Sequence, residues 1–194
     1  LYYAHQDDDS QEMADVLGAF SKLIDAGKVR VLGASNFHAM RLKKAIDVAT
    51  EQGLPHYHVF QPEYNLLSRD GFEGELQDLC INHNIGVAPY YGLASGFLTG
   101  KYRSKDDLGK SARGSRVEKF LDGNGPAVLA AMDQVADETG ASLAQIALAW
   151  LAAQEGVTAP IASATSIEQL DDLIGSWDVE LSTDQLERLT NAGV

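Results

Sequence analysis

The residues best suited to chemistry in this sequence are hydrogen-bonding side chains that follow short apolar runs. In chain order they are His5, Ser35, Asn36, Gln61, Tyr90, Ser163 and Thr165. If the apolar runs are parallel strands, these side chains stand at the strand ends where parallel sheets place their ligand sites. A closed barrel makes such side chains converge on one polar ligand, whereas an open sheet spreads them along one edge.

A cationic segment follows the apolar run that ends at Tyr90. Residues 101–116 hold six basic and two acidic side chains, a net charge of +4, which leaves −17 for the remainder of the chain. The basic residues are Lys101, Arg103, Lys105, Lys110, Arg113 and Arg116. The segment is suited to folding over an anionic ligand such as a dinucleotide pyrophosphate, and a solvated loop is the alternative.

Several other kinds of chemistry are not supported. Cys80 is the only cysteine and lies in an apolar run, and the acidic run 7–9 precedes a predicted helix, so no metal site is expected. There is no Walker A loop and no G-x-G-x-x-G opening a helix. With 28 acidic and 15 basic residues, the net charge of −13 disfavours nucleic acid and anionic membranes as partners. A cytoplasmic location is expected.

The elements that position these residues alternate between strand and helix. Strands are predicted to end near residues 5, 34, 60 and 89, with a fifth at 157–161. Helical periodicity appears over 13–24, where Ser10 is the candidate cap, and over 42–49, 76–80, 128–136 and 143–151. Ser142 and Ser182 are the predicted caps of two later helices. Residues 101–124 look like a long polar segment.

The repeat of roughly 28 residues corresponds to one strand and one crossover helix, which indicates an α/β fold with a parallel sheet. The whole chain, 1–194, is expected to be a single domain. Five strands fit either an open doubly wound sheet or five-eighths of a closed barrel, and the repeat alone does not separate the two. The chain begins at Leu1 inside an apolar run, so we expect a segment upstream.

Four motifs in register resemble the aldo-keto reductase family. They are GASNF at 33–37, QPEYN at 61–65, YYGL at 90–93 and LTGK at 98–101. The resemblance covers nearly the whole chain and ends with 163–170, which is similar to the segment with which the family clamps its cofactor. It implies a (β/α)8 TIM barrel of which this chain supplies about the last five βα units.

The resemblance also implies an activity, the NADPH-dependent reduction of aldehydes or ketones, of the alcohol dehydrogenase type. His5 matches the histidine of the family's Asp, Tyr, Lys and His tetrad, which orients the substrate. The other three would lie before Leu1. This chain alone is therefore expected not to turn over substrate, either because it is a fragment or because a partner chain completes the sheet.

The resemblance assigns different residues to different parts of the cofactor. Ser35, Asn36 and Gln61 would hydrogen-bond the nicotinamide carboxamide, and Tyr90 would stack on the ring. The loop 92–101 would wrap the pyrophosphate. The pyrophosphate residues in this loop are Gly92, Leu93 and Ser95, and those for a 2′-phosphate are Lys101 with Arg113 or Arg116.

The adenosine end of the cofactor would meet a third group. Its members are Ser163, Thr165, Gln169 and Asp172. Leu173 departs from the asparagine usual in the family, which removes a hydrogen bond expected at the adenine. NADPH is the expected cofactor, and NADH is possible.

Two other functions stay open at this point. A nucleotide-sensing regulatory subunit, like the channel-associated members of the same family, would use cofactor redox state to bias a partner. An unrelated doubly wound binding domain would place its ligand at the switch point of an open sheet.

Overall fold

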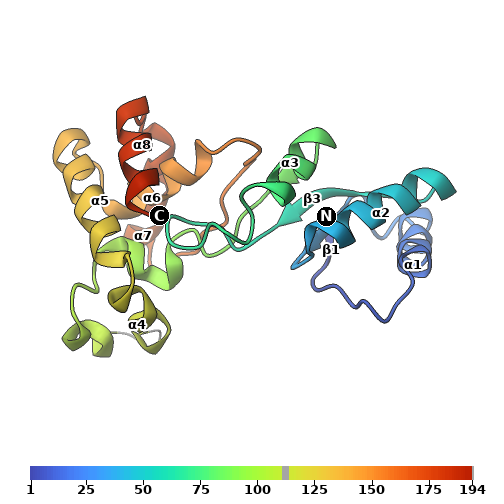
Figure 1. The fold of residues 1–194 in the computed structure, drawn as a ribbon, viewed down its shortest axis with the longest axis horizontal. Helices are drawn as coiled ribbons and strands as arrows, with labels where there is room; N and C mark the ends of the chain where they lie inside the picture. The colour runs from blue at the N-terminus through green and yellow to red at the C-terminus, as the bar shows by residue number, and fades with distance from the viewer. Residues whose placement is uncertain (111–113, 194) are drawn as a thin grey trace. The chain divides into compact units, whose positions relative to one another are not determined.

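The computed structural model describes residues 1–110 and 114–193, which fold as two compact units (Figure 1). Unit 1 consists of Leu1–Pro62 and Asp70–Ala88, and unit 2 consists of Glu63–Arg69 and Pro89–Val194. The predicted single domain stays a prediction. Each unit is described by itself.

Unit 1 is built on a parallel sheet with strand order β1-β2-β3-β4. The strands are β1 (Tyr2–Ala4), β2 (Leu32–Ser35), β3 (Tyr57–Gln61) and β4 (Gly86–Val87). The connecting helices are α1 (Met13–Asp25), α2 (Ala39–Gln52) and α3 (Glu75–Asn82). The predicted α/β class with a parallel sheet is therefore confirmed. The strand order shows no reversal among the described strands, whereas a doubly wound sheet has its ligand crevice at such a reversal.

The two faces of this sheet differ. Ala34, Phe60 and Val87 share one face by register and are buried. On the same face Tyr2 meets Phe20 of α1 edge to face, with ring centroids 6.0 Å apart, so this is the face that the helices cover. In Figure 1, α1 and α2 lie beside each other. The opposite face is only partly covered.

Some helix ends are explained by capping residues, and one predicted cap does not form. Gly53 ends α2 in the left-handed conformation, with φ of 64°. Ser142 and Ser182 each form the predicted cap as a full capping box. Ser10 does not cap α1; the N-cap is Glu12, because Ser10 instead donates its hydroxyl to Asp8 Oδ1 at 2.6 Å.

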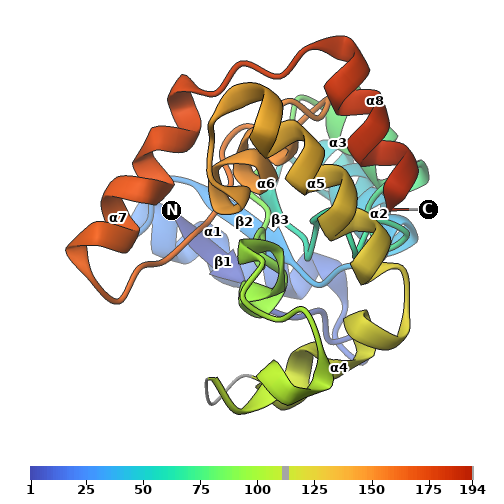
Figure 2. The same ribbon diagram turned by 90° about the vertical axis from the view of Figure 1, so that its left-hand side faces the viewer.

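Unit 2 is helical around a buried centre that includes Trp150. Its elements are η1 (Ala94–Thr99), η2 (Lys105–Lys110), α4 (Gly114–Asp122), α5 (Gly125–Thr139), α6 (Leu143–Ala152), α7 (Ile167–Ile174), η3 (Gly175–Asp178) and α8 (Thr183–Ala192). In Figure 2, α5 lies between α6 and α8. The indole of Trp150 is fully buried and donates to Thr190 Oγ1 at 2.9 Å, which fixes α6 against α8.

In unit 2 one expected strand is wrong and one helix was not predicted. Residues 157–161 form no strand; Ile161 N–H donates to Pro89 O at 2.8 Å, but Pro160 has no N–H with which to continue a ladder. The polar segment 101–124 contains a helix that the sequence did not predict, α4 (Gly114–Asp122), whose Val117 is buried. Within the described ranges no helix has the length and apolarity needed to cross a bilayer.

Candidate functional site

The predicted carboxamide-binding residues form one hydrogen-bonded cluster at the carboxyl ends of β1, β2 and β3. The Asn36 side-chain N–H groups donate to His5 O at 2.8 Å and to Ser35 Oγ at 3.2 Å. Ser35 Oγ donates in turn to Gln61 O at 2.8 Å. Asn36 adopts a left-handed backbone, with φ of 59°, a conformation that asparagine tolerates better than most residues. The cluster therefore fixes three strand ends to one another.

The members of this cluster are not equally free to meet a ligand. Ser35 is 1% exposed and the one proton of its hydroxyl is donated to Gln61, so the hydroxyl can offer a ligand only acceptor capacity. Both Asn36 side-chain N–H groups are engaged. Gln61 is half-buried, and its side-chain amide shares a hydrogen bond with the hydroxyl of Tyr3, which leaves the other end of the amide for a further partner.

His5, the predicted catalytic residue, lies directly after β1 and is exposed. Its backbone carbonyl is fixed by Asn36, so the imidazole projects from an anchored position at the strand end. An imidazole there can hydrogen-bond a substrate oxygen. The described residues contain no group of three or more His, Cys, Asp or Glu side chains arranged to hold a metal ion.

In unit 2 the predicted pyrophosphate loop has an unusual backbone. Tyr91, Ala94 and Ser95 have φ of 57°, 47° and 57°, and Gly96 follows at 92°. Left-handed residues other than glycine are uncommon, and such strain is maintained only where packing enforces it. Gly92 supplies part of that packing, because a Cβ there would lie 3.1 Å from methyl groups of Leu148 and Leu151. The loop is therefore held tightly against α6.

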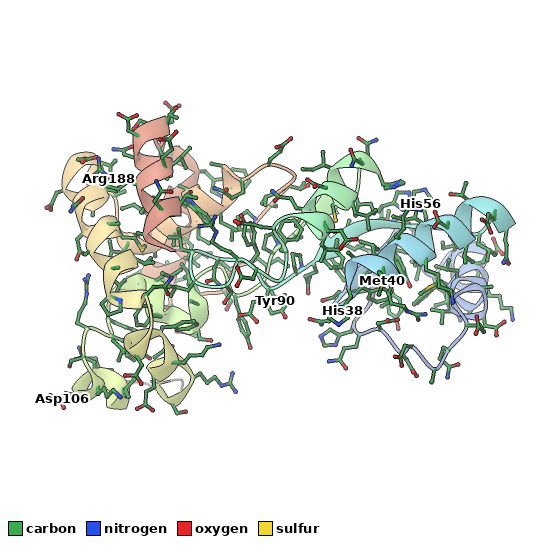
Figure 3. All side chains as sticks on the ribbon, viewed as in Figure 1. His38, Met40, His56, Tyr90, Asp106 and Arg188 are labelled. Atoms are coloured by element: carbon green, nitrogen blue, oxygen red, sulfur yellow. The ribbon has the colours of Figure 1, made fainter. Side chains whose placement is uncertain are left out.

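Tyr90 precedes this loop, and its ring meets that of Tyr91 edge to face, with centroids 5.0 Å apart. Figure 3 shows the Tyr90 side chain projecting away from the ribbon. Burial, reinforced by the negative charge of Glu63, raises the pKa of the Tyr90 phenol. The phenol is thus kept neutral, which suits a stacking surface better than proton transfer near neutral pH.

A pocket of about 370 Å³ opens between this loop and α4. It is lined by Glu63, Tyr91, Ala94, Ser95, Arg116, Lys119 and Phe120. Arg116 and Lys119 are one turn apart on α4, so both cations reach the same space. Neither forms an ion pair with a carboxylate among the described residues. The lining also holds the carboxylate of Glu63, so two cations against one anion give it a net positive charge that is suited to an anion.

The remaining cations of segment 101–116 are mostly neutralised. Arg103 makes two bonds to Asp133, at 2.7 and 2.8 Å. The Lys105 ammonium lies 2.9 Å from Asp122, and that of Lys110 lies 2.7 Å from Asp107. Lys101 stays available; its Nζ lies 5.2 Å from the centre of the Tyr102 ring and beside Gly96. Arg113 lies outside the described residues.

The predicted adenosine-binding residues are only partly available. Thr165 donates its N–H and hydroxyl to Gln169 Oε1, at 2.9 and 3.0 Å, so the two predicted partners are in contact. Asp172 accepts a 2.7 Å hydrogen bond from Ser142 Oγ, which joins α7 to the start of α6. Ser163 is exposed. Asp172 thus has a structural role that the sequence did not predict.

Sequence reasoning missed Lys119, Glu63 and Tyr91 as pocket residues, and Tyr3 as the partner of Gln61. Lys119 could have been found from its spacing of three to Arg116, had 114–122 been interpreted as a helix from the apolar pair Val117 and Phe120. The contact of Tyr3 with Gln61 joins strands separated by 58 positions and had no local signal.

Comparison with known proteins identifies the family. The model of the Aldo/keto reductase family matches residues 1–193. The chain therefore belongs to the aldo/keto reductase family, as the motifs indicated, and the interpretation as an unrelated doubly wound domain is wrong.

Three relatives with different names illustrate the proteins to which this chain is similar. The chain is 29% identical to the L-glyceraldehyde 3-phosphate reductase of Escherichia coli K12, over 97% of this chain and 56% of the relative. It is 32% identical to a probable voltage-gated potassium channel subunit beta of Arabidopsis thaliana, over 92% and 56%. It is 26% identical to the aldo-keto reductase yakc [NADP(+)] of Schizosaccharomyces pombe, over 99% and 56%. The chain spans about half the length of these curated relatives.

Proposed function

We propose that this chain carries the cofactor-binding residues of an NADPH-dependent oxidoreductase that reduces aldehydes or ketones to alcohols. The observation that carries the proposal is the hydrogen-bonded cluster of Asn36, Ser35 and Gln61, with His5 anchored beside it. Family membership supports the reductase activity, and one relative names NADP(+).

The residues of unit 1 fit the amide end of a nicotinamide. A carboxamide has both a donor end and an acceptor end. The free end of the Gln61 side-chain amide would meet one of them, and the Ser35 oxygen, which can only accept, would accept from the carboxamide N–H. His5, exposed at the end of β1, would hydrogen-bond the substrate carbonyl oxygen and so orient it. The bound cofactor would supply the hydride to the carbonyl carbon.

The residues of unit 2 fit the phosphates. Arg116 and Lys119 face one pocket without carboxylate partners in the described chain, and Ser95 adds a hydroxyl. Of the cations predicted for a 2′-phosphate, Lys101 and Arg116 have no carboxylate partner among the described residues. Both would bind a 2′-phosphate through charge-assisted hydrogen bonds. Asp172 is already bonded to Ser142, and Thr165 is bonded to Gln169, so the adenosine end would depend mainly on the exposed Ser163 and the side-chain nitrogen of Gln169. NADH stays the weaker alternative.

The fold part of the proposal is a TIM barrel. Consecutive strand order with a helix between successive strands is the topology of a (β/α)8 barrel, and this sheet would be part of one. No residue of this chain matches the Asp, Tyr or Lys of the family tetrad. We therefore propose that the 194-residue chain alone binds cofactor without turnover, and that further strands, from a longer form or a partner chain, complete the catalytic centre.

The experiment compares turnover in two forms. NADPH oxidation is followed at 340 nm with a panel of aldehydes that includes L-glyceraldehyde 3-phosphate, using this chain and a form extended at its N-terminus. We expect turnover only in the extended form, with a loss of about 100-fold in kcat on His5→Ala. His5→Ala with unchanged kcat would remove His5 from the mechanism.

A second candidate function is a nucleotide-sensing regulatory subunit. It is favoured by the 32% identity to a probable potassium channel subunit beta. A regulatory subunit binds NADPH but reduces carbonyls slowly or not at all. Tight NADPH binding together with negligible turnover in the extended form would favour this candidate over the reductase.

A further inference from the structure

Tyr3 and Gln61 lie on the same, partly covered face of the sheet, although they belong to different strands. Tyr3 of β1 is paired with Gly33 of β2, and Gly33 is paired with Val59 of β3. Partners in register point to the same face, and so does Gln61, two residues beyond Val59. The Tyr3 side chain must therefore cross β2 to reach Gln61.

Gly33 provides the space for this crossing. A Cβ at position 33 would lie 2.4 Å from Cε1 of Tyr3 and 2.5 Å from Cδ1, much closer than carbon atoms approach in van der Waals contact. The φ of Gly33 lies outside the left-handed region, so its backbone conformation does not require glycine. Glycine weakens a strand interior, and here its position is explained by the ring that lies on it.

Gln61 is consequently held at two points. Its backbone carbonyl accepts from Ser35 Oγ at 2.8 Å, and its side-chain amide shares a hydrogen bond with the Tyr3 hydroxyl. The amide has one donor end and one acceptor end, so a partner at one end decides which end faces a ligand. A glutamine without such a partner would sample several rotamers and lose entropy on binding.

We propose that Tyr3 is a positioning residue for Gln61: its ring, seated over Gly33, fixes the Gln61 amide in the orientation in which it receives the amide of a ligand. The ligand part rests on the proposed function, in which that amide is the nicotinamide carboxamide. Tyr3 itself touches neither cofactor nor substrate in this assignment and acts through Gln61.

The pair is tested first without ligand, in the 194-residue chain. Tyr3→Phe keeps the ring over Gly33 and removes only the phenolic oxygen. We expect the Gln61 side-chain amide protons, observed by 15N-edited NMR, to exchange roughly 5-fold faster in this variant. Tyr2→Phe is the matched control, because Tyr2 lies on the helix-covered face, and it should leave these signals unchanged. Unchanged Gln61 signals in Tyr3→Phe would overturn the proposal.

The second arm measures the Kd of NADPH. We expect Tyr3→Phe to weaken binding by about 3- to 10-fold, with a Tm equal to that of Tyr2→Phe. In a Gln61→Leu background the same substitution should have no further effect. An equal loss in both backgrounds would show that Tyr3 does not act through Gln61. If the wild-type chain does not bind NADPH, the proposed function fails, whereas the amide exchange still decides whether Tyr3 positions Gln61.

Discussion

Arg41 and Asp7 form a two-point ion pair, in which Nε and Nη2 of Arg41 each lie 2.7 Å from a carboxylate oxygen of Asp7. The two side chains are 18% and 14% exposed, much less than the ion pairs on the surface of the helices. The pair fixes the segment after His5 to α2 and thereby supports the strand end that carries the candidate catalytic histidine.

Breaking this pair should destabilise unit 1. Arg41→Ala is expected to lower the free energy of unfolding by about 1–3 kcal/mol, because it leaves a partly buried carboxylate without its bidentate partner. Urea unfolding followed by far-UV circular dichroism measures the change. Lys43→Ala is the control, since the Lys43–Asp47 pair is about half exposed and should contribute less than about 0.5 kcal/mol. Equal losses in both variants would contradict the assignment.

Tyr57→Phe should not destabilise the protein. The Tyr57 ring is 1% exposed between Phe20 and Phe37, and within the described residues its hydroxyl is the one buried side-chain polar atom without a hydrogen-bond partner. Removing an unsatisfied hydroxyl is expected to leave the free energy of unfolding unchanged or to raise it by up to about 1 kcal/mol. A loss of more than 1 kcal/mol in urea unfolding would mean that the hydroxyl has a partner in solution.

Stability should fall at alkaline pH. Burial raises the pKa of Tyr57 and of Cys80 to about 12, from ordinary values of 10.0 and 9.0. Above pH 9 the unfolded chain therefore binds fewer protons than the folded chain, so the free energy of unfolding decreases as pH rises towards 12. The contribution is complete below pH 9. Urea midpoints measured from pH 8 to pH 11 should fall, and less steeply above pH 10 in Tyr57→Phe than in wild type.

The cations of the unit 2 pocket should contribute directly to NADPH affinity. Arg116→Gln and Lys119→Gln are each expected to raise the Kd about 10-fold, the loss of one charge-assisted bond. Lys105→Gln is the matched control, because Lys105 is paired with Asp122 and Glu118, and it should change the Kd less than about 2-fold. If all three variants weaken binding equally, the effect comes from net charge and not from the pocket.

The sequence predicted those parts of the fold that depend on local pattern. Hydrophobic periodicity located α1, α2, α5 and α6. The cap residue Ser142 located the start of α6, and Ser182 with Gln185 three residues later located the start of α8. Hydrophobic periodicity did not reveal α4, because this helix lies between glycines and charged residues separate its apolar residues Val117 and Phe120. The strand expected at 157–161 failed because β-branched and apolar residues alone do not supply the ladder that Pro160 interrupts.

For the candidate site, the sequence predicted residue types but not their partners. The motif at 33–37 pointed to Ser35 and Asn36. It did not show that the Ser35 proton and one Asn36 proton are donated to the backbone carbonyls of Gln61 and His5, 26 and 31 positions away. The charge count over 101–116 treated all six basic residues alike, whereas Asp133 and Asp122 neutralise two of them from 30 and 17 positions away. Contacts between distant segments decide which cations remain available for a ligand, and no local pattern encodes them.

The most direct test of the central claim is a titration of the 194-residue chain with NADPH and with NADH, followed by nicotinamide fluorescence. Binding of NADPH at least about 10-fold tighter than NADH, with the preference reduced in Arg116→Gln, is the result predicted by a cationic phosphate pocket. Binding of neither nucleotide, or equal binding of both in wild type and variant, would contradict the assignment of these residues to an NADPH site.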